Sequence, residues 1–344
     1  MQPELMVTLW PSFPHFPRFA RDARLSGIRL NSAMMSHPEL DQELERIAAF
    51  GPSVPLWFDV KARQPRIAEI LPSPDRLVVR LNHPIRVRTP QIVLFKAAAD
   101  RGLLERVEDG GRTLVFAPGA EHGPRYQVKP GESLHIRHPS FKILGPLFTD
   151  QELGKIEKVR AAGFTRWFLS YVEEQADVDL LTELVGKDAE LMLKIETERG
   201  LRYATQEFRK RANHTLVAAR GDLYVEIDQP HRILGALRSI VEADPEAQVG
   251  SRILLSVVSE PVPSCADFCE LAWLRDIGYR RMMLCDELCL KEDLLATAVN
   301  AYEAFARDYT TPTPPEASAP TDPRYPTGAP PKSKKRSFLS RLFT

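Results

Sequence analysis

The feature that most constrains the fold of this chain is the stretch 189–228, AELMLKIETERGLRYATQEFRKRANHTLVAARGDLYVEID. It contains two short apolar runs, 191–195 and 215–219, which each end in a polar cluster and are separated by a helix-like segment. This order predicts a βαβ unit, in which a helix joins two parallel strands. The sequence therefore indicates an α/β protein.

Charged residues end both predicted strands. Lys194 and Glu196 share one face of the first strand, because side-chain direction repeats every two residues, and Arg220-Gly221-Asp222 follows the second strand. In α/β sheets and barrels the chemistry lies at the C-terminal ends of parallel strands, where these groups would meet. Two carboxylates suit a hard cation such as Mg²⁺ or Mn²⁺, and a lysine beside them can neutralise a developing negative charge. A structural ion pair explains the same spacing, so residue spacing alone leaves both interpretations open.

The amino-acid sequences of the two strands indicate a family more specifically than the spacing of their charged residues does. KIET-x-x-G-L at 194–201 and ARGDLYVEI at 219–227 resemble the pyruvate kinase family, in which these strands read KIEN-x-x-G-V and MVARGDLGVEI. The resemblance extends over roughly 5–66 and 141–307. It implies a magnesium-dependent barrel in which Glu196 and Asp222 hold the metal. The other implied roles are catalysis for Lys194, Arg29 and Ser256, and substrate binding for Gly221, Arg220, Arg66 and Lys61.

Apolar runs and helix-like segments alternate along the chain about eight times, as a TIM (β/α)8 barrel requires. We expect the first part of the barrel at 1–66 and the remainder at 141–308, with a helix at 18–27 and, in the stretch 251–264, a strand that ends at Ser256. Between the two barrel parts, 67–140 contains short β-rich pieces separated by Pro, Gly and Asp turns, which predicts a small antiparallel domain. Its position matches that of the mobile lid in pyruvate kinases.

Two positions of the family's potassium site differ in this chain. Arg29, Asn31 and Asp59 match the family's second and third strands, but Ala33 stands in place of a serine and Val60 in place of a threonine. The monovalent-cation site of Asn31 and Asp59 is therefore degraded, and we expect potassium dependence to be reduced or absent.

The C-terminal region 309–344 is rich in Pro, Ser and Thr and ends in KSKKRSFLSRLFT, so we expect a disordered tail. The end at 332–344 is either a basic amphipathic contact for a membrane surface or protein partner, or a plain soluble tail. Without a signal peptide or long apolar run the chain is expected to be cytoplasmic. Equal numbers of basic and acidic residues, 46 each, give no electrostatic case for nucleic acid. Two C-x3-C pairs, at 265–269 and 285–289, allow a zinc site, but free thiols are the simpler interpretation.

Three hypotheses about function follow. The first is a pyruvate kinase-like phosphotransferase that converts phosphoenolpyruvate and ADP to pyruvate and ATP. The second is a metal-dependent keto-acid lyase or aldolase on the same barrel. The third is a catalytically weak binding or scaffold protein, and a homo-oligomer is compatible with each.

Overall fold

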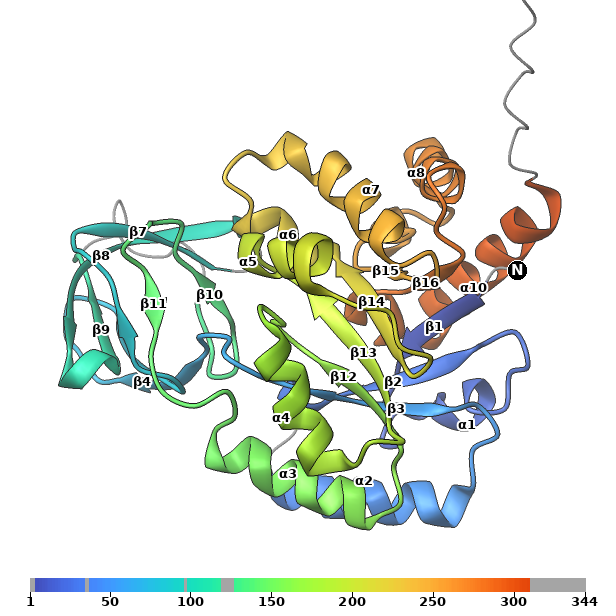
Figure 1. The fold of residues 1–344 in the computed structure, drawn as a ribbon, viewed down its shortest axis with the longest axis horizontal. Coiled ribbons are helices and arrows are strands. Elements are labelled where there is room, and N and C mark those ends of the chain that lie inside the picture. Colours follow the sequence, from blue (N-terminus) through green and yellow to red (C-terminus); the bar gives the residue numbers. More distant parts are fainter. Residues whose placement is uncertain (1–3, 35–36, 96–97, 119–126, 310–344) are drawn as a thin grey trace, which may run out of the picture. The chain divides into compact units, whose positions relative to one another are not determined.

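The computed structural model describes residues 4–34, 37–95, 98–118 and 127–309. Within these residues a closed barrel of parallel strands has the order β1-β2-β3-β12-β13-β14-β15-β16, and β16 pairs back to β1 (Figure 1). The predicted (β/α)8 barrel is thereby confirmed. The strands are β1 (Glu4–Thr8), β2 (Gly27–Asn31), β3 (Leu56–Val60), β12 (Arg166–Leu169), β13 (Glu190–Ile195), β14 (His214–Ala219), β15 (Gln248–Gly250) and β16 (Arg281–Met283).

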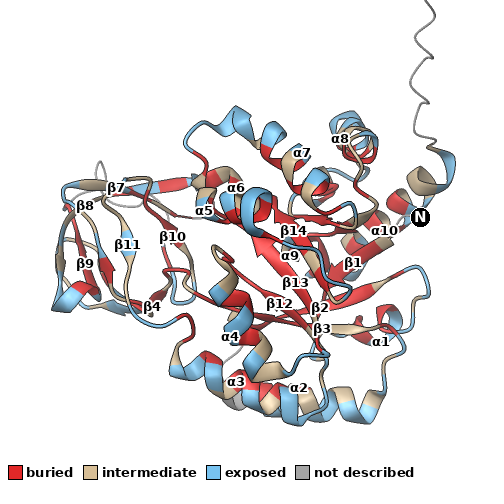
Figure 2. Ribbon diagram, in the orientation of Figure 1, coloured by how far each residue is buried: buried red, intermediate tan, exposed pale blue. Residues whose placement is uncertain are grey.

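Helices surround the barrel and turn one face toward it. Figure 2 shows the barrel strands buried almost throughout, whereas α3, α4, α7 and α8 carry exposed residues on their outer faces. The helices are α1 (Phe16–Phe19), α2 (His37–Phe50), α3 (Asp150–Ala161), α4 (Gln175–Val185), α5 (Glu198–Arg202), α6 (Arg220–Glu226), α7 (Ile233–Ala243), α8 (Cys265–Asp276), α9 (Asp286–Cys289) and α10 (Glu292–Asp308).

Strand alternation divides the side chains between two layers. On β13, Leu193 and Ile195 belong to the large core between barrel and helices, whereas Met192 belongs to a small apolar cluster with residues of five other barrel strands. Lys194 has the same parity as Met192, so it lies on the inner face, one step nearer the C-terminal end of the strand. The inner apolar cluster consists of Met6, Trp57, Phe168, Met192, Val217 and Met283.

The insertion after β3 is a six-stranded antiparallel sheet with the order β10-β7-β8-β9-β5-β4, accompanied by the pair β11-β6. Its own apolar core includes Phe95 and Phe116. The small β-rich insertion is therefore confirmed, while its boundaries as a domain, 67 and 140, stay a prediction. The strands are β4 (Ile67–Leu71), β5 (Val78–Leu81), β6 (Ile85–Arg86), β7 (Gln91–Phe95), β8 (Asp100–Glu108), β9 (Thr113–Phe116), β10 (Leu134–His135) and β11 (Lys142–Ile143).

The helix predicted at 18–27 is wrong. The only helix in this segment is α1, which ends at Phe19. The Asp22 carboxylate accepts the backbone N–H of Arg24 at 3.0 Å, and such a local side-chain bond competes with the helical hydrogen-bond pattern. The segment between β1 and β2 is consequently built from turns after Phe19.

The strand predicted in the stretch 251–264, with Ser256 at its end, is also wrong. β15 ends at Gly250, and Ser251, Arg252 and Leu254 all have positive φ angles, of 70°, 61° and 53°. Left-handed backbone is incompatible with a strand. A 3₁₀ helix follows at Leu255–Val258, so the barrel strand is three residues long and lies just before the predicted one.

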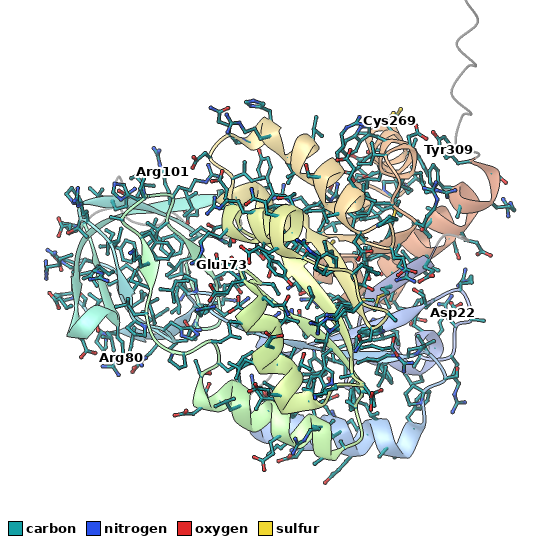
Figure 3. All side chains as sticks on the ribbon, in the orientation of Figure 1. Asp22, Arg80, Arg101, Glu173, Cys269 and Tyr309 are labelled. Atoms are coloured by element: carbon teal, nitrogen blue, oxygen red, sulfur yellow. The ribbon has the colours of Figure 1, made fainter. Side chains whose placement is uncertain are left out.

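The cysteines do not share one environment. Cys265 and Cys269 lie exposed on α8, where Figure 3 labels Cys269, whereas Cys285 and Cys289 are buried, and all four are free thiols. The predicted tail, including the segment 332–344, lies outside the described residues apart from Tyr309. Among the described residues, no helix is both long and apolar enough to cross a membrane.

Candidate active site

Asp59 is the centre of a buried charge cluster at the C-terminal end of β3. Its side chain is completely buried, and Oδ2 accepts from Arg29 Nε and Lys61 Nζ, each at 2.7 Å. Ser170 Oγ donates to Oδ1 at 3.0 Å, and Lys194 Nζ lies 3.5 Å from Oδ2. Burial alone would raise the pKa of Asp59, but the charges of Lys194, Lys61 and Arg29 hold it well below its usual value. Asp59 is therefore an anion that organises three cations.

Lys194 links Asp59 to Glu196. Lys194 Nζ lies 3.0 Å from Glu196 Oε1 and 3.0 Å from Ser170 Oγ, while the backbone N–H of Tyr171 donates to Glu196 Oε2 at 2.7 Å. Burial works against the charge of Lys194, but Asp59 and Glu196 outweigh it and raise its pKa. Lys194 is thus an ammonium ion at neutral pH.

Glu196 and Lys61 are less favourably placed as ions. Burial raises the pKa of Glu196 to about 7 although Lys194 is its neighbour, and burial lowers the pKa of Lys61 to about 7 although Asp59 is its partner. Desolvation in this cluster is thus only partly compensated by the surrounding protein charges. A bound cation would stabilise the ionised form of Glu196, and a bound anion would stabilise the protonated form of Lys61.

Asp222 completes the pair of carboxylates. It lies in the first turn of α6, its charge contributes to the raised pKa of Glu196, and Gln64 Nε2 lies 3.5 Å from its Oδ1. Burial would raise the pKa of Asp222, but His135, Lys194 and Arg66 lower it. The structure thus brings Glu196 and Asp222 together at the ends of β13 and β14, as the sequence predicts.

The β-rich insertion reaches this site through His135, a residue that the sequence analysis did not single out. The buried His135 ring places Nδ1 2.5 Å from Glu226 Oε1 and Nε2 3.4 Å from Asp222 Oδ1. Arg137 donates to the backbone carbonyls of Tyr224 and Val225 on the same helix. Since α6 carries Asp222, the insertion holds the helix that presents a site carboxylate.

Arg29 has a second carboxylate partner. Its NH1 lies 2.8 Å from Asp286 Oδ1, and Asn31 Nδ2 donates to Asp286 Oδ2, also at 2.8 Å. Burial would raise the pKa of Asp286, but Arg29 lowers it. The guanidinium is therefore shared between Asp59 on its inner side and Asp286 on its outer side.

Two predicted site residues face other partners. Arg220 NH1 lies 2.6 Å from Glu270 Oε1, and its NH2 donates to the carbonyl of Ser251 at 2.5 Å. Ser256 Oγ donates to Asp267 of α8 and accepts the backbone N–H of Ser264 at 2.9 Å. Neither residue has a described contact with Lys194, Glu196 or Asp222, and their predicted roles stay predictions.

Arg66 and Gly221 remain close to the cluster. Arg66 donates to Gln64 Oε1 and, at 2.6 Å, to the carbonyl of Gly131 in the insertion, and its charge acts on Asp222. Gly221 lies beside Asp222 at the start of α6, where an added Cβ would come within 3.2 Å of Ser251 Oγ. Both residues thus lie near Asp222, and their predicted roles in substrate binding stay predictions.

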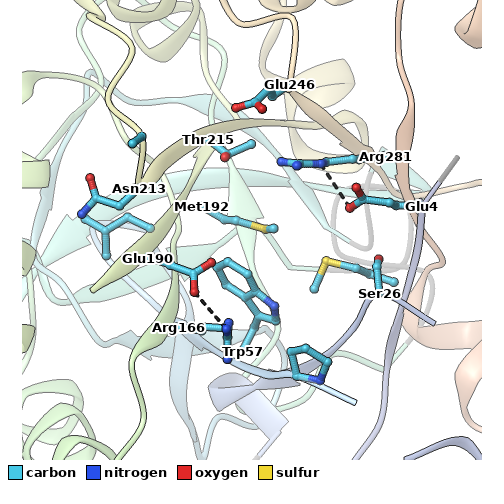
Figure 4. A pocket seen from close by; sticks show the side chains of 14 residues that line it. Glu4, Ser26, Trp57, Arg166, Glu190, Met192, Asn213, Thr215, Glu246 and Arg281 are labelled. Atoms are coloured by element: carbon cyan, nitrogen blue, oxygen red, sulfur yellow. Dashed lines mark ion pairs between the residues drawn. The ribbon is translucent and has the colours of Figure 1, made fainter. Parts of the chain in front are cut away.

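A cavity of about 290 Å³ lies at the opposite, N-terminal end of the barrel (Figure 4). Figure 4 shows Trp57 and Met192 between two ion pairs. These pairs are Arg166 with Glu190 at 3.0 Å and Arg281 with Glu4 at 3.2 Å. Charged residues that pair with one another at this end of a barrel usually serve stability, so we place the candidate active site at the C-terminal end.

Fold and site together define a (β/α)8-barrel protein with a lysine and two carboxylates at the C-terminal mouth. The sequence is similar to that of a pyruvate kinase from Borreliella burgdorferi, with 24% identity over 285 residues. The match covers 75% of this chain and 58% of that protein, so the chain spans less than two thirds of its relative. No family model matches the chain. The similarity supports a pyruvate kinase-like relationship.

Proposed function

We propose that this chain is a pyruvate kinase-like enzyme that uses a divalent metal to transfer the phosphoryl group of phosphoenolpyruvate. The observation that carries the proposal is the position of Lys194, 3.0 Å from Glu196 and within the charge cluster of Asp59. A protonated lysine beside paired carboxylates is suited to stabilising negative charge that develops on an oxygen atom. ADP is the acceptor that the sequence resemblance implies.

The donor atoms present fit Mg²⁺ or Mn²⁺. Glu196 and Asp222 offer carboxylate oxygens, which hard cations prefer, and substrate and water oxygens would complete the coordination. The raised pKa of Glu196 indicates a buried carboxylate whose charge is incompletely balanced. When bound, the metal would supply charge neutralisation at the phosphoryl and enolate oxygens. Among the described residues no three His, Cys, Asp or Glu side chains form a metal cluster by themselves, so the proposal relies on the pair.

The side chains of the site would position the substrate and neutralise the charge of its phosphoryl group. Lys194 would hold the ammonium against the transferring phosphoryl group, and Arg66 would contact a phosphate from the hinge that leads into the insertion. Gly221 stays the predicted contact of the substrate carboxylate. The insertion, anchored to α6 by His135, would exclude water from the site.

The Asp59 cluster supports turnover without potassium. Lys61 and Arg29 contact Asp59 Oδ2, and Ser170 contacts Oδ1, so protein groups occupy both oxygens of the carboxylate. A monovalent cation at Asp59 would either compete with Lys61 and Arg29 at Oδ2 or bind beside Ser170 at Oδ1, close to the Lys194 and Arg29 charges. The expectation of weak potassium dependence therefore rests on these contacts as well as on Ala33 and Val60.

The lyase or aldolase hypothesis remains the second candidate. One observation favours it: Arg29, for which the resemblance implies a catalytic role in phosphoryl transfer, already pairs with Asp59 and Asp286. A keto-acid lyase needs the metal pair and Lys194 but no nucleotide.

The test measures proton exchange on pyruvate, a partial reaction that needs no phosphoryl acceptor. With Mg²⁺, the enzyme should exchange the methyl protons of pyruvate for deuterium, which NMR detects as loss of the methyl signal. Lys194→Met should slow this exchange about 100-fold or more, because a single preorganised charge donor contributes that much. Lys158→Met is the matched control, since Lys158 pairs with Asp41 on the outer surface. Equal exchange by Lys194→Met and the wild type would refute the proposal.

The complete reaction is assayed separately as pyruvate formation from phosphoenolpyruvate with Mg²⁺ and ADP. This assay tests whether ADP is the phosphoryl acceptor. The roles of the metal pair and Lys194 are tested by the proton-exchange experiment.

A further inference from the structure

A groove lies among the helices around the barrel, between α6, α7 and α8 (Figure 1). Its volume is about 400 Å³, which is in the range of binding sites for small molecules. Its lining is mainly apolar and includes Tyr224 of α6, Ile233, Leu234 and Leu237 of α7, and Cys269 and Trp273 of α8. Leu234 is 53% exposed, so the groove offers apolar surface to a ligand that enters from solvent.

Two arginines line this groove in different surroundings. Arg220 is buried, and its charge is balanced by Glu270, whose Oε1 lies 2.6 Å from NH1. Arg252 is exposed and makes no ion pair within the described residues, and its guanidinium carbon lies 5.6 Å from the centre of the Tyr224 ring. The charged side chains of the groove therefore leave one positive charge unbalanced, beside an aromatic ring.

The backbone that carries Arg252 is held in a rare conformation. Ser251, Arg252 and Leu254 have φ angles of 70°, 61° and 53°, which residues other than glycine seldom adopt. Leu254 is completely buried, and the carbonyl of Ser251 accepts from Arg220 NH2 at 2.5 Å, so the core and Arg220 hold this segment in place. Strained backbone of this kind recurs at ligand sites, where it fixes the position of a side chain.

The aromatic side chains of the groove favour a planar ligand. Tyr224 and Trp273 are both half-buried there, and Arg238 lies over the Trp273 ring with 5.8 Å between its guanidinium carbon and the ring centre. Offset stacking and edge contacts with such rings stabilise a planar ring system beyond the area that it buries. A cationic ligand would be repelled by Arg252, and an anionic one would be attracted.

We infer that this groove binds a small molecule with a flat aromatic body and one anionic group. The aromatic body lies between Tyr224, Trp273 and the apolar side chains of α7, and the anion pairs with Arg252. Binding here is separate from the chemistry of Lys194 and does not depend on the proposed function.

The test is calorimetric titration of the full chain with naphthoate and with its uncharged amide, naphthamide. Both compounds have the same ring system, so the difference in affinity reports the contribution of the charge. The wild type should bind naphthoate about tenfold more tightly, and Arg252→Gln should bind the two compounds equally, because it lacks the guanidinium charge. Arg202→Gln is the matched control, since Arg202 is exposed on α5 and does not line the groove, and it should keep the preference of the wild type.

Leu234→Asp tests the apolar side of the groove. It should weaken the binding of both compounds at least about fivefold, because a charged group replaces an apolar contact. Leu180→Asp is the control, since Leu180 is 37% exposed on α4 and does not line the groove, and its affinities should equal those of the wild type. Thermal midpoints of all variants close to that of the wild type exclude misfolding as the cause.

Four results would overturn the inference. The wild type could bind neither compound, or bind both equally. The preference for naphthoate could persist in Arg252→Gln, or the control variants could lose binding as much as the groove variants do. A change of sedimentation coefficient in Arg252→Gln and Leu234→Asp without a change in affinity belongs to the third of these results, and it would show that the groove is an interface between copies of this chain.

Discussion

The raised pKa of Glu196 predicts a specific pH dependence of stability. In the unfolded chain Glu196 titrates near its ordinary value of 4.5, and in the folded protein burial raises the pKa to about 7. The folded state therefore binds more protons than the unfolded state between these two values, and the stabilising contribution of protonated Glu196 is lost as the pH rises through 7. The shift corresponds to about 3 kcal/mol at most.

Glu196→Gln isolates this contribution, because glutamine resembles the protonated acid and does not titrate. Urea unfolding of both proteins in metal-free buffer gives the difference in unfolding free energy at each pH. Relative to the variant, the wild type should lose about 3 kcal/mol of stability between pH 4.5 and 7, and little more above pH 7. A difference that does not change with pH would show that Glu196 is ionised in the folded protein throughout this range.

The control is Glu246→Gln at the opposite end of the barrel. Glu246 pairs with Lys210 at 2.8 Å, and this hydrogen bond lowers its pKa. In the folded protein Glu246 therefore takes up its proton below pH 4.5. The wild type and Glu246→Gln should differ by a constant amount over the range in which Glu196 acts.

Further predictions concern stability, ion requirement and the insertion. Asp59→Asn should lower the unfolding free energy by about 3 to 5 kcal/mol in urea titrations, because it leaves buried cations without their partner. Rates of pyruvate methyl exchange should be equal in potassium chloride and choline chloride. His135→Gln should speed hydrogen–deuterium exchange in β10 and leave the barrel strands protected, because the contact with Glu226 is weakened. Gly200→Ala should lower the thermal midpoint, since its Cβ would lie 2.5 Å from the carbonyl oxygen of Val172. Three results would contradict these predictions: an unchanged thermal midpoint in Gly200→Ala, unchanged hydrogen–deuterium exchange of β10 in His135→Gln, or pyruvate methyl exchange that requires potassium.

The centre of the site could be predicted because its residues follow regular strands. Lys194 and Glu196 have a fixed parity at the end of one strand, and Asp222 begins the helix after the next strand. Parallel neighbours in a barrel bring such ends together whatever the loops do. A correct assignment of the strands was therefore sufficient to predict that these three residues lie close together.

Residues outside regular strands were harder to predict. The left-handed backbone at Ser251, Arg252 and Leu254 displaces Ser256 from a strand end into a 3₁₀ helix, and none of these residues is a glycine that would signal such a turn. His135 lies in the insertion, where the sequence pattern fixes strands but not their packing against α6. Its partner Glu226 is 91 residues away along the chain, a distance over which periodicity gives no information.

The pairing of β1 with β16 has a consequence for how the chain folds. Glu4 lies opposite Arg281, so the contact that closes the barrel joins residues 277 positions apart, whereas β13 and β14 pair across a short helical connection. Loop-closure entropy and synthesis order both favour the local pairs first. Until β16 has been made, β1 is an unpaired strand edge of apolar residues, and this interval is when the nascent chain is most exposed to misassembly with other chains. Barrel closure is thus a late step, and the first strand made is among the last to find both neighbours.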